Sequence, residues 1–490
     1  SLATRLYRVA DLPFAAPHLS DKLVLDAHSD AHLAARSEVF STLDMRLQKT
    51  VQRNLSQYVE NHKAQGINNA SAMLLDTHSG EVLALVGSVD YFAASIQGQV
   101  NGTHAKRSPG STLKPFIYAL ALDQGVLHPQ TILKDAPTNF GPFSPENFDG
   151  RFVGPITAQQ ALVRSRNIPA VAVANQLKTP TLYQFLQAAG VSKLAAEPHY
   201  GLALALGGAE LSMAELAQLY VLLGNGGKVV PLRYQRDVAD PVERQNSAPL
   251  LSEAAAFITV QMLKTNVRPD TARPASPAVA WKTGTSWGFR DAWTAGLFGR
   301  YVLVVWVGNF DGSSNPALVG IQTAAPLFFN IVDSLRAQGL GNQELSRIPP
   351  ASVTQVEVCA ASGELPNEWC KDTVPSWFIA GKSPIKVSRL HRAINIDTRT
   401  GQPSCEHNAF VHPVVFEFWS SDLQQLFRAA GIPRRVPPNA PACALLGSET
   451  AIEMSDAPQI SSPNRGGSYT QRLSAPVPLS LRLKMPAFAS

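Results

Sequence analysis

The sequence predicts an α+β fold in which helices pack on an antiparallel sheet, followed by a small β-rich C-terminal region. Two strand-like runs occur early, within residues 71–88, and three more follow one another from residue 278. The long segment between them, residues 115–265, alternates helical patterns with loops rich in proline and glycine. Strands that open and close a region, with helices between them, are typical of an antiparallel sheet covered by helices.

Each element is predicted by the spacing of its apolar residues. Residues 41–61 place leucine and valine at intervals of four, which gives a helix one apolar stripe. Residues 71–88 hold two apolar runs on either side of a polar turn sequence that ends in glycine, which predicts a β-hairpin. Residues 278–286, 291–299 and 301–309 are predicted to form three consecutive strands.

The composition limits the class of protein. The 490 residues are enough for two or three domains with a large buried core. Hydrophobic residues make up 45% and charged residues only 16%, which argues against disorder and against a solvent-exposed coiled coil. The net charge of +5 comes without a cluster of lysine and arginine, so the chain suits an acidic substrate or an anionic surface rather than nucleic acid.

No part of the sequence is expected to cross a membrane. The most apolar segment, residues 201–227, is interrupted by glutamate and glutamine and predicts a mostly buried helix. The first residues hold no apolar run as long as a signal peptide, and the chain starts with serine. We therefore expect a fragment or a processed chain.

Four regions are predicted along the chain. Residues 1–40 show little periodicity and are expected to form a linker, and residues 41–345 form the α+β domain. From about residue 346 the chain changes to short strands, scattered prolines and all of the cysteines, so residues 346–447 are predicted to be a β-rich extension. Residues 448–490 end in alternating leucines, and because a lone strand cannot bury its face, we expect a truncated β-domain or a tail.

The four cysteines, Cys359, Cys370, Cys405 and Cys443, predict disulfides. They contain no C-x-x-C spacing, which fits zinc poorly. An even number in one region is typical of an oxidising compartment such as a bacterial periplasm. Of the three possible pairings we favour the two that are local in sequence, 359–370 and 405–443; four reduced cysteines in a core are the alternative.

The first candidate catalytic motif is S-x-x-K at Ser111 and Lys114. Pro109-Gly110 predicts a turn before it, and a buried helix is expected to begin just after it. A serine at a helix start lies near unpaired N–H groups, and a lysine three residues on projects to the same face, where partial burial would lower its pKa and let it take the serine proton. The motif is common by itself, and Ser383 to Lys386 repeats it without a helix after it. An ordinary helix cap beside a solvated lysine is the alternative.

The second motif is S-x-N at Ser165 and Asn167, on a loop between helical patterns. The hydroxyl could relay a proton and the amide could hold a substrate carbonyl. Two further copies begin at Ser313 and Ser462. Only the copy at Ser165 lies between the other two motifs.

The third motif is the single K-T-G, Lys282-Thr283-Gly284, followed by Thr285 and Ser286 at the end of an apolar strand. Lys282 supplies positive charge, the threonine hydroxyls can bind a carboxylate, and the Thr285 amide can point into a site. Gly284 lets a substrate backbone lie against the strand edge. A strand-end lysine before a turn is the alternative.

The three motifs, 54 and 117 residues apart, resemble those of penicillin-binding proteins and serine β-lactamases. Further stretches, such as "LLDTHSGEVLALVGS" and "WKTGTSWGFRDAW", are similar to the transpeptidase domain of class A penicillin-binding proteins. The segment from residue 378 to residue 405 resembles the C-terminal extension of the penicillin-binding protein 1C type. The resemblance covers roughly residues 40–445. The family's usual membrane anchor and glycosyltransferase domain are not found in this sequence, so glycan polymerisation is not assigned to it.

The resemblance implies a serine-type D-Ala–D-Ala transpeptidase that cross-links peptidoglycan stem peptides and is acylated by β-lactams. It implies that Ser111 is the nucleophile, Lys114 the base, and the Ser111 and Thr285 amides the oxyanion hole. It implies that Ser165 assists proton transfer to the leaving D-alanine and that Asn167 orients the acyl donor. Lys282 is also counted among the catalytic residues, and with Thr283 and Thr285 it is expected to receive the terminal carboxylate. Gly284 and Ser286 are further residues expected to bind the substrate.

The resemblance also implies surroundings for the enzyme. No metal or organic cofactor is expected, and the location is the periplasm, where the family is anchored to the inner membrane. The C-terminal region is a candidate for binding the cell wall or cell-wall synthesis proteins.

Other functions remain open on the sequence. A D,D-carboxypeptidase would use water as acceptor, and a penicillin-binding sensor or scaffold would keep the fold without turnover. A class A β-lactamase is disfavoured because no E-x-x-L-N lies between Asn167 and Lys282. Residues 284–288 match a G-x-S-x-G nucleophile elbow, but the expected turn and strand after them replace the helix that an elbow needs.

Overall fold

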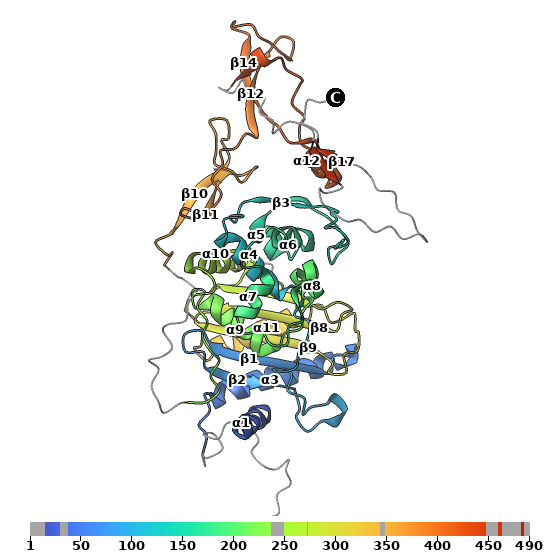
Figure 1. Cartoon of the computed structure of the whole chain (residues 1–490), viewed down its shortest axis with the longest axis vertical. Helices are drawn as coiled ribbons and strands as arrows, with labels where there is room; N and C mark the ends of the chain where they lie inside the picture. Colours follow the sequence, from blue (N-terminus) through green and yellow to red (C-terminus); the bar gives the residue numbers. More distant parts are fainter. Residues whose placement is uncertain are drawn as a thin grey trace, which may run out of the picture. The chain divides into compact units, whose positions relative to one another are not determined.

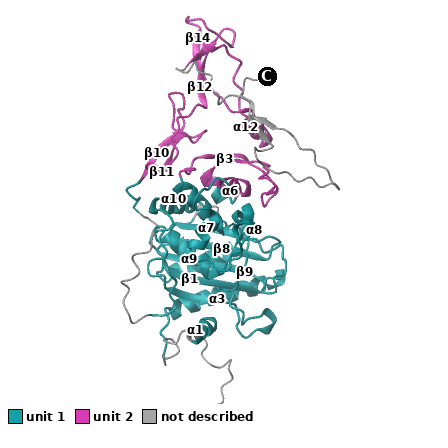
Figure 2. Ribbon diagram, viewed as in Figure 1, with its two compact units in different colours: residues 1–124, 162–165, 174–352 teal, residues 125–161, 166–173, 353–490 magenta. Residues whose placement is uncertain are grey.

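The computed structural model describes residues 15–29, 38–236, 249–271, 273–343, 348–446, 459–462 and 482–484. These residues form two compact units, coloured separately in Figure 2. The first unit comprises residues 1–124, 162–165 and 174–352, and the second comprises residues 125–161, 166–173 and 353–490. The domain limits expected from the sequence stay predictions.

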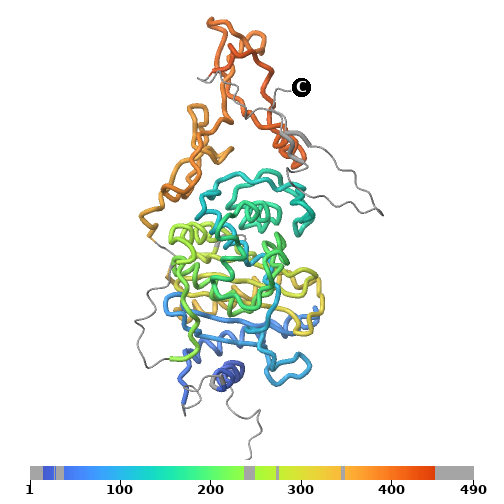
Figure 3. Tube along the Cα trace, in the orientation of Figure 1, coloured from blue at the N-terminus to red at the C-terminus, as the bar shows by residue number. Residues whose placement is uncertain are grey.

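The first unit is built on a five-stranded sheet in the order β2-β1-β9-β8-β7. Its strands are β1 (Asn69–Asp76), β2 (Val82–Val86), β7 (Val279–Thr285), β8 (Asp291–Phe298) and β9 (Tyr301–Gly308). All neighbouring strands are antiparallel, so the predicted hairpin and the three predicted consecutive strands are confirmed. Figure 3 shows that β1, from the start of the unit, and β9, from near its end, lie side by side. Strands β2 and β7 form the two edges of the sheet, and Figure 1 labels β2, β1, β9 and β8 in their order across it.

Helices pack against this sheet and bury its strands. They are α3 (Met45–His62), α4 (Lys114–Asp123), α9 (Met213–Gly224), α10 (Glu253–Lys264) and α11 (Ala324–Arg336). Helices α3 and α11 pack on each other and share one apolar core with the sheet. Helix α9 contacts β1, β8 and β9, and α10 contacts β7 and α4. Every residue of β1 and β8 is buried, which explains why these strands read as continuous apolar runs rather than alternating ones.

Two helices differ from the prediction. Helix α1 (Pro17–Ser29) lies in the segment expected to be a linker. The single helix expected over residues 201–227 is instead a 3₁₀ helix, Gly201–Leu206, followed by α9. The break has a local cause, because Ser212 and Glu215 form a capping box that starts α9.

The second unit holds small antiparallel sheets and two disulfides. It contains β3 (Ile132–Asp135), β4 (Gly154–Thr157), β10 (Val353–Cys359), β11 (Thr373–Ile379), β12 (His391–Asp397), β13 (Gln402–Pro403), β14 (Val411–Glu417), α12 (Ser421–Ala429) and β15 (Leu445–Leu446). Cys359 bonds to Cys370 and Cys405 bonds to Cys443, so the favoured pairing is confirmed. Cys359, Cys370 and His391 lie close together, with His391 Nδ1 3.4 Å from the Cys359 sulfur. Because the two sulfurs are bonded to each other in the disulfide, they are not metal ligands.

The remaining elements complete the description. They are α5 (Ala158–Val163), α6 (Asn167–Ala174), α7 (Leu182–Ala188), α8 (Glu197–Tyr200), β5 (Val267–Arg268), β6 (Arg273–Pro274), β16 (Gln459–Ser462) and β17 (Arg482–Lys484). Most of the predicted tail lies outside the described residues. Among the helices that are described, none combines the length and the apolar character needed to cross a membrane. The antiparallel sheet with packed helices and the β-rich C-terminal region confirm the predicted fold class.

Candidate active site

Ser111 lies in a 3₁₀ turn, Gly110–Leu113, that runs directly into α4. The sequence predicted that Ser111 lies at the start of a helix. In the structure a 3₁₀ turn precedes α4, and Ser111 lies in that turn. The Lys114 N–H donates to the Ser111 carbonyl oxygen. Side chains three residues apart eclipse each other in a 3₁₀ turn, so Ser111 and Lys114 project to the same side.

Ser165 receives hydrogen bonds from two lysines that are distant in sequence. The fully buried Lys114 donates from Nζ to the Ser165 carbonyl oxygen at 2.7 Å and lies 3.5 Å from its Oγ. Lys282 donates from Nζ to Ser165 Oγ at 2.8 Å and to the Thr283 carbonyl oxygen at 3.0 Å. Ser165 itself has a φ of 58°, in the turn between α5 and α6. The Ser165 hydroxyl therefore connects Lys114 of the S-x-x-K motif with Lys282 of the K-T-G motif.

Lys282 is a buried amine whose charge is perturbed by its surroundings. Burial lowers the pKa of Lys282 to about 7, since the charged form loses its hydration. At neutral pH the amine is thus close to the midpoint between its charged and neutral forms. Such a group can bind an anion when protonated and can accept a proton when neutral.

Thr285 turns its amide to the free edge of β7, and its hydroxyl accepts a hydrogen bond. The Ser286 N–H donates to the Asp291 carbonyl oxygen in β8 at 3.0 Å, and because successive N–H groups of a strand point to opposite sides, the Thr285 N–H points to the free edge of β7. Thr285 Oγ1 accepts a hydrogen bond from the Gly320 N–H at 2.9 Å. The Thr285 hydroxyl proton is therefore available to an anion.

The backbone of β7 packs tightly against the turn that carries Ser111. A methyl group on Gly110 would lie 2.8 Å from Thr285 N and 2.5 Å from Thr285 O. A methyl group on Gly284 would overlap the Pro109 carbonyl oxygen and lie 2.9 Å from Thr112 Cγ2. An internal contact thus requires glycine at position 284, and the substrate contact expected for Gly284 stays a prediction.

Ser286 and Asp291 close the hairpin between β7 and β8. Ser286 is buried, and its Oγ accepts a hydrogen bond from the Asp291 N–H at 2.9 Å. This side chain bonds within the hairpin, and a contact of Ser286 with substrate stays a prediction. The Asp291 carboxylate accepts from Trp306 Nε1 at 2.9 Å and pairs with Arg107 at 3.3 Å. Sequence reasoning missed Arg107 and Asp291 because they belong to no motif.

Asn167 belongs to the second unit, whereas the other predicted site residues belong to the first. It begins α6, where its N–H donates to Asn147 Oδ1 at 2.8 Å and its side-chain amide donates to the Glu146 carbonyl oxygen at 2.7 Å. The preceding Arg166 pairs with the buried carboxylate of Asp135 at 2.7 Å. These bonds fix the start of α6 within its own unit.

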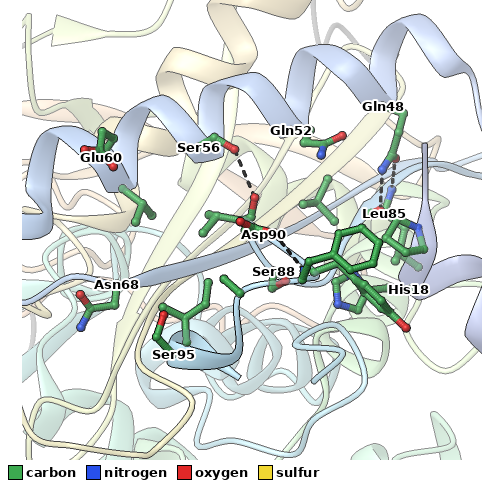
Figure 4. Close-up of a pocket in the computed structure, with 18 of the residues that line it drawn as sticks. His18, Gln48, Gln52, Ser56, Glu60, Asn68, Leu85, Ser88, Asp90 and Ser95 are labelled. Atoms are coloured by element: carbon green, nitrogen blue, oxygen red, sulfur yellow. Dashed lines mark hydrogen bonds between the residues drawn. The ribbon is translucent and has the colours of Figure 1, made fainter. Parts of the chain in front are cut away.

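A cavity of about 490 Å³ lies elsewhere in the first unit, between α1, α3 and the segment after β2 (Figure 4). None of the predicted site residues lines it. Its buried polar groups are already satisfied, since Gln48 bonds to the backbone of Leu85 and Ser88 donates to the Gly98 carbonyl oxygen. This cavity therefore offers little to a ligand.

Comparison with known families assigns the two parts of the chain separately. Residues 70–321 match the family model described as "Penicillin binding protein transpeptidase domain". Residues 349–393 match "Penicillin-binding protein 1A, C-terminal domain".

Individual relatives agree with this match. Penicillin-binding protein 1C of Escherichia coli (strain K12) is 35% identical over 393 residues, which are 76% of this chain and 47% of the relative. The chain spans about half the length of the curated relatives that it matches.

Two solved structures share the fold. Penicillin-binding protein 1A from Haemophilus influenzae aligns with a TM-score of 0.63 and 19% identity, over 76% of this chain and 77% of that one. The PonA1 protein from Mycobacterium tuberculosis in complex with penicillin V aligns with a TM-score of 0.55 and 18% identity, over 69% and 96% of the two chains. At these identities the likeness concerns the fold alone.

Proposed function

The chain belongs to the penicillin-binding protein transpeptidase family, and from this premise we propose that it is a serine D,D-transpeptidase of peptidoglycan synthesis. The observation that carries the proposal is the convergence of two buried lysines on Ser165, beside the turn that holds Ser111. This arrangement offers a nucleophile, a base and a proton relay within one compact unit.

In the first step, Ser111 Oγ attacks the carbonyl carbon of the penultimate D-alanine of a stem peptide. Its proton passes to Lys114, which projects to the same side of the 3₁₀ turn. The oxyanion that forms is stabilised by the N–H groups of Ser111 and Thr285. The outward orientation of the Thr285 amide and its closeness to Gly110 support this role.

In the second step, the C–N bond breaks and the terminal D-alanine leaves. The proton held by Lys114 reaches the departing nitrogen through the Ser165 hydroxyl, which both lysines approach. The acyl group stays on Ser111 until an amine of a second stem peptide replaces it. We propose that Asn167 orients the acyl donor.

The terminal carboxylate of the donor binds at β7. Thr285 has a hydroxyl proton available, because its oxygen accepts from Gly320, and the half-buried Thr283 is the next residue on the same face. Lys282 adds positive charge in its protonated form. A β-lactam carries a comparable carboxylate, so we expect it to acylate Ser111 through the same contacts.

The second unit supports a location outside the reducing cytosol. Its two disulfides are typical of oxidising compartments, and we propose the periplasm. We also propose that this unit binds the cell wall or other cell-wall synthesis proteins. Deletion of residues 346–490 with no change in localisation or partner capture would count against that role.

The test of the proposed chemistry is reaction with a fluorescent penicillin, followed by mass spectrometry of the labelled peptide. We expect one adduct, on Ser111, and none in the Ser111→Ala variant. Ser383→Ala is the matched control, because Ser383 begins the second S-x-x-K and should leave the adduct intact. An adduct that persists in Ser111→Ala would disprove the nucleophile. Turnover of a stem-peptide mimic with and without an amine acceptor then separates transfer from the carboxypeptidase reaction.

A further inference from the structure

Trp287 is almost completely exposed to solvent, directly beside the candidate active site. Its exposed fraction is 97%, whereas Trp281, Trp293 and Trp306 in the adjoining strands are fully buried. It is the second residue after Thr285, at the start of the turn between β7 and β8. An indole left in water in this way loses the burial that normally stabilises a tryptophan, which suggests that it serves a ligand.

Trp287 continues the accessible face of β7. Lys282, Gly284 and Ser286 are buried, whereas Thr283, Thr285 and Trp287 are accessible. This alternation is that of a strand, and the hydrogen bond from Ser286 N–H to Asp291 extends it past the end of β7. A ligand whose carboxylate lies at the two threonine hydroxyls therefore has the indole as its next neighbour along the strand.

The turn that carries Trp287 is held in place from two sides. Within the turn, the Phe289 N–H donates to the Ser286 carbonyl oxygen at 3.2 Å. From the neighbouring loop, the Asn315 N–H donates to the Phe289 carbonyl oxygen at 2.9 Å, and the Ser314 hydroxyl donates to the Gly288 carbonyl oxygen. The exposed indole thus stands on a fixed backbone, which reduces the entropy lost when a ligand binds it.

We propose that Trp287 contacts the acyl acceptor, an amine-bearing peptide, and holds it next to the acyl-enzyme. This inference rests on the proposed transpeptidase function and adds the site of its second substrate. When the terminal D-alanine leaves, the acceptor amine must enter where the leaving nitrogen was, so the rest of the acceptor extends from the carboxylate subsite toward the turn. The acceptor arrives as an ammonium ion, and the face of an indole attracts cations more strongly than other aromatic rings. Trp287 therefore holds the ammonium group on arrival, before the amine loses its proton and moves to the acyl carbonyl carbon.

The transfer step then balances without a further reactant. The acceptor ammonium loses one proton, which passes through the Ser165 hydroxyl to neutral Lys114. The resulting amine attacks the acyl carbonyl carbon. The bond to Ser111 Oγ breaks, and Oγ regains a proton from Lys114. The excess proton from the acceptor is released to solvent. Trp287 exchanges no proton in this sequence and is a substrate-contacting residue.

The test measures how the acyl-enzyme divides between an amine and water. The protein is acylated with a depsipeptide or thioester donor in the presence of a dipeptide amine, and the transferred and hydrolysed products are quantified together. We expect Trp287→Ala to lower the ratio of transfer to hydrolysis by about two- to fivefold, the range of an exposed cation–π contact. Trp287→Phe should keep most of the ratio. Phe92→Ala, which removes a half-exposed aromatic ring on the segment after β2, is the matched control.

The possible outcomes distinguish a failure of the role of Trp287 from a failure of the proposed transpeptidase function. An unchanged ratio in Trp287→Ala, equal to those of the wild type and Phe92→Ala, would overturn the role of Trp287 and leave the transpeptidase intact. A wild type that forms no adduct, or that only hydrolyses the donor at saturating amine, would overturn the proposed transpeptidase and the inference with it. Because the ratio is taken within one acyl-enzyme, a variant that acylates more slowly does not distort it.

Discussion

Gly110→Ala tests whether the packing of the Ser111 turn against β7 sets the geometry of the site. Gly110 has a φ of 52°, and an added methyl group would lie 2.5 Å from Thr285 O and 2.8 Å from Thr285 N. Gly312 offers a matched control, because its φ is 71° and a methyl group there would meet nothing within 4 Å. The two substitutions share the backbone strain, and only the first adds the collision.

The size of the effect follows from these distances. Non-bonded heavy atoms are most stable about 3.5 Å apart, so the turn and β7 must separate by about 1 Å to admit the methyl group. A displacement of about 1 Å at reacting groups costs about 10²-fold in rate. The left-handed φ costs each alanine variant about 1–2 kcal/mol of folding stability, and overpacking adds about 1–3 kcal/mol to Gly110→Ala alone.

The assay is the second-order rate constant for acylation by a fluorescent penicillin, with the melting temperature measured in parallel. We expect Gly110→Ala to be slowed about 10²-fold and Gly312→Ala to acylate as the wild type does. Below its melting temperature, a folded Gly110→Ala variant that acylates within about threefold of the wild type would refute the reasoning, because the predicted displacement would be harmless.

Three further predictions concern charge, hydrogen bonding and cross-links. Burial lowers the pKa of Lys282 to about 7, so its positive charge is present below that pH and lost above it. The affinity for a β-lactam before acylation should therefore weaken as the pH rises through about 7, because its carboxylate loses the charged partner. Stopped-flow titration should show this pH dependence in the wild type and not in Lys282→Met. Thr285→Val should weaken the same affinity about tenfold by removing the donor hydroxyl, and Thr285→Ser should restore it. Loss of the Cys405–Cys443 disulfide, which spans a sequence separation of 38, should destabilise the second unit by about 3–4 kcal/mol in denaturant unfolding while leaving Ser111 labelling unchanged.

The sheet and its main helices could be predicted because their signals are local. Strands β7, β8 and β9 follow one another with short turns, so apolar runs and turn residues were enough to find them. The break between the 3₁₀ helix Gly201–Leu206 and α9 was not predicted, although the S-x-x-E of Ser212 and Glu215 is a local signal of the capping box that starts α9. The 27-residue apolar stretch around it concealed that signal.

The inner geometry of the site could not be predicted, since it depends on contacts between distant segments. Lys282 meets Ser165 across 117 residues, and its pKa depends on burial that no local pattern records. The tight approach of Gly110 to Thr285 likewise joins the first motif to the third through their backbones. The hydrogen bond that Ser286 Oγ accepts from the Asp291 N–H is also a contact that the K-T-G motif does not record.

The hydrogen bonds at Ser165 also order the protonation states in the proposed mechanism. A serine hydroxyl has one proton to donate and two lone pairs to receive, and Lys282 fills one lone pair at 2.8 Å. The Ser165 proton then needs an acceptor, which a charged amine cannot be and a neutral amine can. Lys114 Nζ lies 3.5 Å from the same oxygen, so in the proposed mechanism a neutral Lys114 is the acceptor for this proton. Two ammonium ions so close to one hydroxyl repel each other, so protonation of either lysine disfavours protonation of the other.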